Sequence, residues 1–219
     1  MHVLHPRELR KMRRAGRAAA ATLDAACALV RPGLSTDRID AFVAADTARR
    51  GGRCSQHGHR VGERRFPGHV CVSPNDVVCH GVPSPHVVLR DGDIVNIDVT
   101  TELEGWHGDT SRTVFVGEPG PEARHVVEVA RRALEVGIAQ VRPGAPMRAI
   151  GRAIEAFARS EGCTVVEDYG GHGIGRMMHE PPTVPHVDTG FDGPRMRVGA
   201  CFTIEPMVCL GGATIRHDP

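Results

Sequence analysis

This chain of 219 residues has few aromatic residues, almost no excess of charge and no long apolar run. Its 27 Lys and Arg residues balance 26 Asp and Glu residues, which argues against the strongly basic surface of a nucleic-acid-binding protein. No segment approaches the roughly 18–20 consecutive apolar residues that a membrane-spanning helix needs. Linkers and low-complexity segments are also missing, and the length predicts one sizeable core or at most two small domains.

The cysteines lack the patterns of a disulfide scaffold or a Cys-x-x-Cys motif. There are seven of them, and this odd number favours reduced thiols, which are typical of a cytoplasmic protein. Arginines precede the stretch AAAATLDAACALV as they would in a signal peptide, but Asp24 interrupts its apolar run. The spacing of three and four between its apolar residues predicts an amphipathic helix over residues 7–30 instead. We therefore expect a soluble, cytoplasmic, monomeric chain that binds neither membranes nor nucleic acid.

A weak internal repeat indicates two related halves. LVRPGLSTDRIDAFVAADTARRGG resembles QVRPGAPMRAIGRAIEAFARSEGC, with Ile39 matching Ile150 and Gly51 matching Gly162. We expect one catalytic domain of two pseudo-symmetric halves, about 1–118 and 119–219. Helices grouped outside a largely antiparallel sheet predict an α+β fold. The expected helices cover 7–30, 36–50, 121–141 and 146–161, and the expected strands lie near 69–73, 93–100, 109–116, 164–168 and 198–209.

Two aspartates in the stretch NIDVTTELEGWHGDT suggest a metal site. Asp98 follows a run of strand-forming residues and points away from its apolar face. With a turn centred near Leu103 and Glu104, Asp98 and Asp109 would lie opposite each other, where like charges are destabilising. Two divalent ions about 3.5–4 Å apart would fit between them. For the two aspartates taken alone, a solvated acidic hairpin is the better interpretation. A calcium site is a second alternative, but the sequence has no loop with the alternating acids of an EF-hand.

Three further segments add candidate residues. GGHGIGRMMHE contains His172 between glycines and His179 seven residues later, without the spacing of a phosphate-binding loop. ACFTIEPMVCL has a buried-strand pattern with Glu205 in the middle, which is costly unless the carboxylate is paired or binds metal. VVCHGVP predicts His80 in a short strand. Taken singly, a buried ion pair for Glu205 and a packed core histidine for His80 are the simpler interpretations.

Together these segments resemble the type I (bacterial) methionine aminopeptidases. The resemblance covers nearly the whole chain through LRKMRRAGRAAAATL, CVSPNDVVCHGVP, DGDIVNIDVT, GWHGDTSRTVFVG, EDYGGHGIGRMMHE and FTIEPMV. It implies a duplicated pita-bread fold, an antiparallel sheet covered by helices. It also implies metal-dependent release of methionine from the N-termini of nascent polypeptides whose second residue is small, near the ribosome.

The resemblance also implies a metal-ligand set. Asp98 would bind one metal ion, Asp109 would bridge two, and His172 and Glu205 would be further ligands. Oxygen-rich ligation with a single imidazole suits two divalent ions of Co, Mn or Fe. The family has a second bridging glutamate in a last strand, for which this sequence has no equivalent, since Asp218 is the only acid after Glu205. We therefore expect a C-terminally truncated relative, in which a single bound ion is an alternative.

Catalytic and substrate-binding roles follow from the same resemblance. Glu205 would shuttle a proton, and His80 and His179 would hold the substrate and stabilise the tetrahedral intermediate. Phe66 and Met178 would line the methionine pocket, although segment 54–69 is rich in arginine and Met178 replaces a bulky aromatic residue. One alternative is an inactive truncated paralogue that keeps the fold and binds a peptide or protein partner. Another is a prolidase- or creatinase-like hydrolase, which normally carries an additional N-terminal domain.

Overall fold

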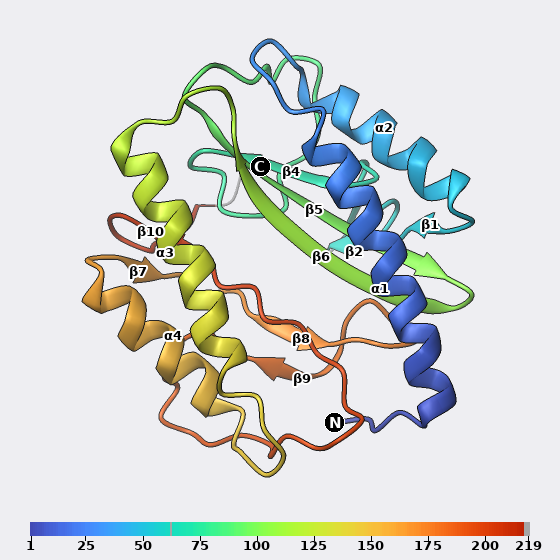
Figure 1. Cartoon of the computed structure of the whole chain (residues 1–219), viewed down its shortest axis with the longest axis vertical. Helices are drawn as coiled ribbons and strands as arrows, with labels where there is room; N and C mark the ends of the chain where they lie inside the picture. The colour runs from blue at the N-terminus through green and yellow to red at the C-terminus, as the bar shows by residue number, and fades with distance from the viewer. Residues whose placement is uncertain (62, 217–219) are drawn as a thin grey trace. The chain divides into compact units, whose positions relative to one another are not determined.

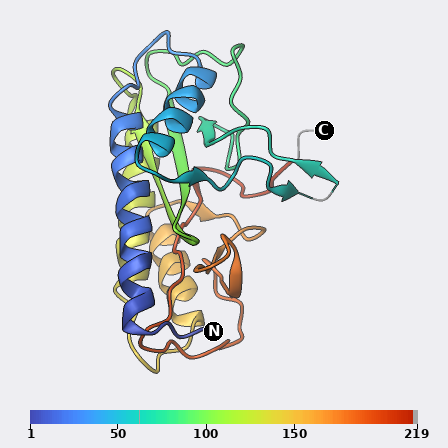
Figure 2. The same cartoon turned by 90° about the vertical axis from the view of Figure 1, so that its right-hand side faces the viewer.

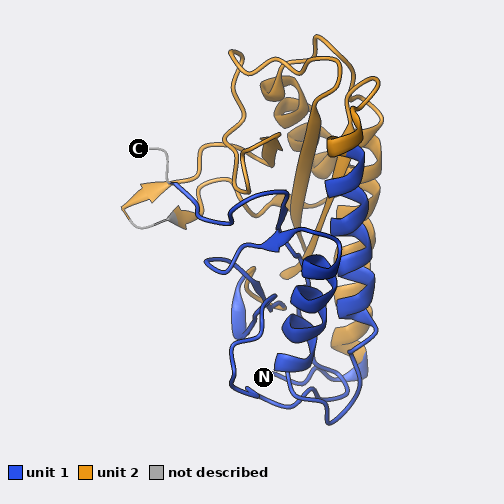
Figure 3. Ribbon diagram, turned by 90° about the vertical axis from the view of Figure 1, so that its left-hand side faces the viewer, with its two compact units in different colours: residues 1–6, 124–174, 179–219 blue, residues 7–123, 175–178 orange. Residues whose placement is uncertain are grey.

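The computed structural model describes residues 1–61 and 63–216, so Asp218 lies outside the described residues. The chain divides into two compact units (Figure 3). Unit 2 contains residues 7–123 and 175–178, and unit 1 contains residues 1–6, 124–174 and 179–219. That they form one catalytic domain stays a prediction. No helix in the described ranges is long and apolar enough to cross a membrane.

Unit 2 consists of two helices, an antiparallel sheet and a short hairpin (Figure 1). Strand β5 is central: it pairs with β6 along its full length and with β1 and β4 in separate stretches. The β2–β3 hairpin forms a separate sheet and projects away from the main one (Figure 2). The elements are α1 (Pro6–Cys27), α2 (Thr36–Arg49), β1 (Arg53–Cys54), β2 (Arg60–Val61), β3 (Arg64–Arg65), β4 (Cys71–Pro74), β5 (Ile94–Leu103) and β6 (Trp106–Phe115).

The core of unit 2 lies between the two helices and the sheet. The alternate residues Val95, Ile97 and Val99 of β5 are fully buried, as the period-two pattern predicts. They pack with apolar residues of α1 and α2, including Leu23 and Ile39. This arrangement confirms the expected antiparallel sheet covered by helices.

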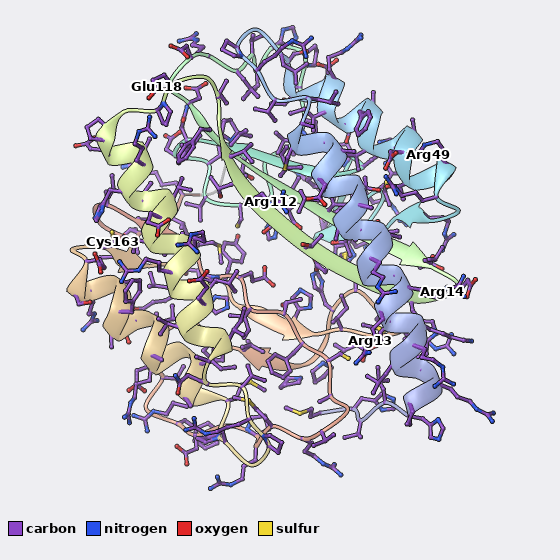
Figure 4. The ribbon with its side chains drawn as sticks, in the orientation of Figure 1. Arg13, Arg14, Arg49, Arg112, Glu118 and Cys163 are labelled. Atoms are coloured by element: carbon purple, nitrogen blue, oxygen red, sulfur yellow. The ribbon has the colours of Figure 1, made fainter. Side chains whose placement is uncertain are left out.

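Two ion pairs connect α1 with the β5–β6 hairpin (Figure 4). Arg14 lies 2.8 Å from Glu104 in the hairpin turn. Arg112 of β6 lies 2.9 Å from Asp24. All four side chains are about half exposed, so each pair adds little stability, and the burial of α1 against the sheet dominates.

The hairpin register differs from the expected one. Its turn is centred on Glu104 and Gly105, which have φ of 54° and 75°, the pattern of a type I′ turn. Asp98 therefore pairs with Ser111, and Asp109 pairs with Thr100. Moving the centre of the turn by one residue shifts the cross-strand partner of every residue by two positions. The two aspartates consequently share a face of the sheet, but they are diagonal and not opposite each other.

Unit 1 packs helices on two small antiparallel sheets. Its core contains Val129 and Ala133 of α3, Ile150 and Ile154 of α4, and Val184 of β9. The elements are α3 (Pro121–Ile138, whose first residues belong to unit 2), α4 (Arg148–Ser160), β7 (Thr164–Val165), β8 (Gly171–Gly173), β9 (Glu180–Val184) and β10 (Val208–Cys209).

The expected strand near 198–209 is wrong over most of its length. Only Val208–Cys209 is a strand, and Phe202 forms a single bridge to Gly173. The backbone groups between them have scattered partners: the N–H of Glu205 donates to a side chain, and the carbonyl of Met207 accepts from Val166. A pattern of apolar residues cannot reveal which partner each backbone group finds. Strands β8 and β9 were not expected.

The two units have equivalent local structure at two positions of the repeat, and the relatedness of the two halves stays a prediction. Gly33 and Gly144 both have φ of 84°, which favours glycine. The N–H of Gly33 donates to the carbonyl of Leu89 at 2.8 Å, and that of Gly144 donates to the carbonyl of Met196 at 2.9 Å. The following helices bury matching residues, which are Ile39 and Ile150, and Val43 and Ile154.

Candidate functional site

The residues predicted for the site are divided between the two units. Unit 2 contains Phe66, His80, Asp98, Asp109 and Met178, and unit 1 contains His172, His179 and Glu205. Within residues 1–61 and 63–216, no group of three or more His, Cys, Asp or Glu side chains is already arranged to hold a metal ion. The assembly of the predicted ligands into one metal site therefore stays a prediction.

In unit 2, Asp98 and Asp109 project from the same face of the hairpin. Diagonal neighbours of this kind have Cα atoms about 7–8 Å apart, still within reach of a shared ion. Burial, followed by the charges of Asp98, Cys79 and Asp109, raises the pKa of the Cys71 thiol. Cys71 pairs directly with Asp98 across β4 and β5. The charges of Asp98 and Asp109 thus both raise the pKa of the same buried thiol, so both carboxylates lie near Cys71.

Gln56 holds the backbone beside Asp98. Its amide Nε2 donates to the carbonyl of Asp98 at 2.8 Å, and its Oε1 accepts from the N–H of Thr100 at 3.2 Å. Gln56 is buried, so these bonds are sheltered from water. Gln56 was not predicted from the sequence, because a single glutamine in a polar segment does not indicate which backbone groups it will bond.

His80 lies in a tight corner and not in the expected strand. Its φ of 55° is uncommon for a residue other than glycine. The next residue, Gly81, accepts a hydrogen bond from the N–H of Val72 at 3.0 Å, and a Cβ on Gly81 would come within 2.2 Å of the carbonyl oxygen of Val72. Burial, with a smaller effect of His59, lowers the pKa of His80. The ring is therefore neutral near pH 7 and can both donate and accept a hydrogen bond.

In unit 1 the structure brings His172, His179 and Glu205 together. The Nε2 of His172 lies 3.5 Å from Oε1 of Glu205. The rings of His172 and His179 meet edge to face, with centroids 4.3 Å apart and planes at 88°. The Nδ1 of His172 lies 3.0 Å from the carbonyl of Gly173, which in the neutral ring places the proton on Nδ1 and the lone pair on Nε2.

The glycines around His172 permit close backbone contacts. A Cβ on Gly171 would lie 2.3 Å from the carbonyl oxygen of Thr203, and a Cβ on Gly173 would lie 2.4 Å from that of Pro181. The sequence-based expectation was that these glycines bring the imidazole close to a bound group. In the structure they let β8 approach two neighbouring segments, which fixes the position of His172.

Glu205 is held from two sides, although it is not in a buried strand as expected. Its side chain is 39 % exposed. The Thr203 hydroxyl donates to Oε1 of Glu205 at 2.6 Å, and the N–H of Glu205 donates to Nε2 of His186 at 3.1 Å. Thr203 also accepts from the N–H of His172 at 2.9 Å. One hydroxyl therefore contacts both His172 and Glu205.

Sequence reasoning missed Thr203 and His186. A signal for Thr203 existed, because it stands two positions before Glu205 in FTIEP, the spacing that puts two side chains on one side of an extended chain. His186 is 1 % exposed, and burial lowers its pKa to about 4. Its Nε2 accepts a hydrogen bond, so Nδ1 carries the proton, and that atom has no partner among the described residues. No pattern distinguishes His186 among 13 histidines.

The two residues expected in the methionine pocket lie in unit 2. Phe66 closes the loop that carries the β2–β3 hairpin: its N–H donates to the carbonyl of His59 at 2.8 Å, and its carbonyl accepts from Gly58 at 2.9 Å. Met178 is buried. Their role in binding substrate stays a prediction.

The donor types of the predicted ligands fit first-row divalent ions. Asp98, Asp109 and Glu205 supply carboxylate oxygens, and His172 supplies one imidazole nitrogen. Such an oxygen-rich set suits Mn²⁺, Fe²⁺ or Co²⁺ and differs from a thiolate zinc site.

Known proteins resemble this chain along most of its length. Residues 10–218 match Metallopeptidase family M24. Methionine aminopeptidase B of a Synechocystis species is 44 % identical over 95 % of this chain and 77 % of its own length. Methionine aminopeptidase of Escherichia coli K12 is 41 % identical over 96 % of this chain and 79 % of its own.

Solved structures agree with the sequence match. Methionine aminopeptidase from Rickettsia prowazekii has a TM-score of 0.92 and 36 % identity, over 98 % of this chain and 84 % of the other. The prolidase from Pyrococcus furiosus has a TM-score of 0.78 and 21 % identity. The match covers 93 % of this chain and 57 % of the prolidase chain, and at this identity it shows only a shared fold. The expected pita-bread α+β fold is thereby confirmed, and membership of a metallopeptidase family implies divalent metal ions as cofactors. The chain belongs to metallopeptidase family M24 and, within it, to the methionine aminopeptidases of the bacterial type I class.

Proposed function

We propose that this chain hydrolyses the peptide bond that follows an N-terminal methionine. The cluster of His172, His179 and Glu205 in unit 1 is the observation that carries the proposal, because it joins two predicted metal ligands to a second imidazole. Relatives at 41–44 % identity carry the name methionine aminopeptidase, which supports the same reaction.

Asp98, Asp109, His172 and Glu205 would hold the divalent ions, with two ions of Mn, Fe or Co as the proposed complement. When bound, such ions supply hydroxide near neutral pH and polarise the scissile carbonyl. Asp109 would serve as the ligand shared by the two ions. The fit rests on the donor types and on the common face of the hairpin.

The side chains of this chain would bind substrate and move protons. Glu205 would carry a proton to the leaving amine, and the Thr203 hydroxyl fixes the carboxylate for that transfer. His179 would donate to the developing oxyanion. The pKa of His80 is lowered, so its neutral ring could donate a hydrogen bond to a backbone carbonyl of the substrate without adding a charge. Phe66 and Met178 would contact the methionine side chain.

The proposed substrates are nascent polypeptides whose second residue is small, and the proposed place is the cytoplasm near the ribosome. We propose that the chain acts as a monomer. The names of the relatives support N-terminal methionine as the residue that is released.

The direct test is the release of methionine from a Met-Ala-Ser peptide with added Mn²⁺ or Co²⁺. We expect release by the unmodified protein, loss of release in the Asp109→Ala variant, and unchanged release in Asp76→Ala, which removes an exposed carboxylate of the same unit. Turnover no higher than that of Asp109→Ala would contradict the proposal.

A second candidate is a relative that keeps the fold and binds a peptide or protein partner without turnover. It is favoured by one observation: no three candidate ligands in the described ranges are already arranged to hold an ion. Metal analysis separates the two candidates, since two tightly bound ions per chain would be inconsistent with a non-enzymatic relative.

A further inference from the structure

A short segment of unit 2 lies between two predicted site residues, His172 and His179, along the chain. The segment is Gly175–Met178, and the residues before and after it belong to unit 1. It forms neither a helix nor a strand, so its position depends on individual contacts. Met178 at its end is buried, whereas Arg176 is exposed.

The backbone of this segment is held by β6. The N–H of His107 donates to the carbonyl of Gly175 at 2.9 Å. The Nδ1 of His107 lies 3.3 Å from the same carbonyl. The N–H of Gly175 donates to the carbonyl of Met177 at 3.2 Å, which folds the segment back on itself. The first residue of the segment is therefore fixed to the β5–β6 hairpin.

The side chain of Arg176 adds a contact of a different kind. Its guanidinium carbon lies over the ring of Trp106, 4.3 Å from the ring centre. A cation within about 6 Å of an aromatic face is attracted by the negative charge of that face, and Trp is the strongest partner. Trp106 is fully buried, so its ring offers the guanidinium a fixed surface.

Arg176 also lies against the turn of the hairpin. Its Nη1 is 3.5 Å from the carbonyl oxygen of Gly105, and a Cβ on Gly105 would come within 3.0 Å of that nitrogen. Among the residues that the structure describes, Arg176 forms no ion pair with a carboxylate. Its charge therefore acts through the Trp106 ring and the Gly105 carbonyl.

The stacked arginine is close in the chain to two residues of the proposed site. Met178 follows Arg176 by two positions and His179 follows it by three. Consecutive Cα atoms are about 3.8 Å apart, so a displacement of Arg176 is passed on to both backbones through a few peptide bonds. Met178 is expected to contact the methionine side chain, and His179 is expected to donate to the oxyanion.

We propose that Arg176, stacked on Trp106, is a positioning residue for the release of methionine. It holds the segment that presents Met178 and His179 to the substrate. Because this role concerns the aminopeptidase reaction, it rests on the proposed function. Lysine is a poor substitute at this position, because its ammonium lacks the planar group that stacks on an aromatic ring.

Steady-state kinetics with Met-Ala-Ser and saturating Mn²⁺ test this role. Arg176→Gln should lower kcat/KM by about 2–30-fold, the range that cation–π contacts span between exposed and desolvated sites. KM should rise, because Met178 shifts against the methionine side chain. Arg176→Lys should fall between Arg176→Gln and the unmodified protein. Arg38→Gln, which removes an exposed arginine of α2, should leave kcat and KM unchanged.

The two kinetic constants separate positioning from a loss of folded protein. A smaller folded fraction lowers the apparent kcat and leaves KM unchanged. Arg176→Gln with an unchanged KM would therefore overturn the proposal. Failure of the unmodified protein to release methionine would instead contradict the proposed function.

Spectroscopy tests the positioning without turnover. Trp106 is the only tryptophan of the chain, so its fluorescence reports on the ring that Arg176 covers. Arg176→Gln should change the Trp106 emission and move the ¹H–¹³C NMR signal of the Met178 methyl group, whereas Arg38→Gln should change neither. A Met178 signal that stays in place in Arg176→Gln would overturn the proposal, whether or not the unmodified protein releases methionine.

Discussion

At the scale of single residues, the candidate site depends on side chains that hold the proposed catalytic groups. Thr203 contacts both His172 and Glu205, and His186 accepts the N–H of Glu205. The sequence predicted His172, His179 and Glu205 as a group, and the structure brings these three together. It could not predict that Glu205 lies outside a buried strand or that His80 lies in a tight corner, because both depend on where backbone hydrogen bonds find partners.

Thr203→Val should lower kcat for Met-Ala-Ser by about 10–100-fold, the effect of losing a hydrogen bond to a charged group worth about 1.5–3 kcal/mol. Thr203→Ser keeps the hydroxyl and should retain most of the activity. The measurement is steady-state kinetics with saturating Mn²⁺. A Val variant with normal kcat would show that the hydroxyl does not position Glu205.

His186 should make stability depend on pH below neutrality. Its pKa falls from 6.5 to about 4 on folding, so only the unfolded state binds the proton between these values. Above pH 6.5 there is no effect, and as the pH falls to 4 the free energy of unfolding drops by roughly 3 kcal/mol from this residue. Urea unfolding at pH 6.5 and 4 should show a larger loss for the unmodified chain than for His186→Gln. Equal losses would contradict this assignment.

At the scale of elements, the sequence predicted the buried face of β5 but not the register of the β5–β6 hairpin. Alternation of apolar residues correctly predicted which face of β5 is buried and which face carries Asp98. The register depended on the turn, where Glu104 adopts a positive φ that its side chain disfavours, and sequence alone placed the centre one residue early. The glycines around His172 were recognised, but the backbones that approach them come from distant segments.

Gly171→Ala should destabilise unit 1 and displace His172. The added Cβ would lie 2.3 Å from the carbonyl oxygen of Thr203, a backbone atom that cannot move aside easily. Overpacking of this kind lowers the free energy of unfolding by about 1–3 kcal/mol. Thermal unfolding is the measurement, and Gly211→Ala, which meets no atom within 4 Å, is the matched control. Equal melting temperatures for the two variants would contradict the close approach.

At the scale of the whole molecule, the repeat appears as two helix pairs, each with a left-handed glycine, Gly33 or Gly144, in the connection between its helices. The repeat was visible in sequence because Pro-Gly and the buried isoleucines recur in order. The ligands were predictable as residue types in matched segments. Their distances were not, since they belong to segments far apart in the chain.

Metal binding should stabilise the folded chain, because an ion that binds the folded state and not the unfolded state shifts the equilibrium toward folding. Added Mn²⁺ is expected to raise the Tm of the unmodified protein. The increase should be lost in Asp109→Asn and in Glu205→Gln, and kept in Asp76→Asn. An increase that survives in both ligand variants would show that the stabilising ion binds elsewhere.

Metal-dependent release of N-terminal methionine can be measured on a single preparation of the protein. The protein is stripped of metal with a chelator, freed of the chelator, and incubated with Met-Ala-Ser while free methionine is quantified before and after addition of Mn²⁺. We expect no release from the stripped protein and release after Mn²⁺ is restored. No release after Mn²⁺ is restored, or equal release with and without the ion, would contradict it.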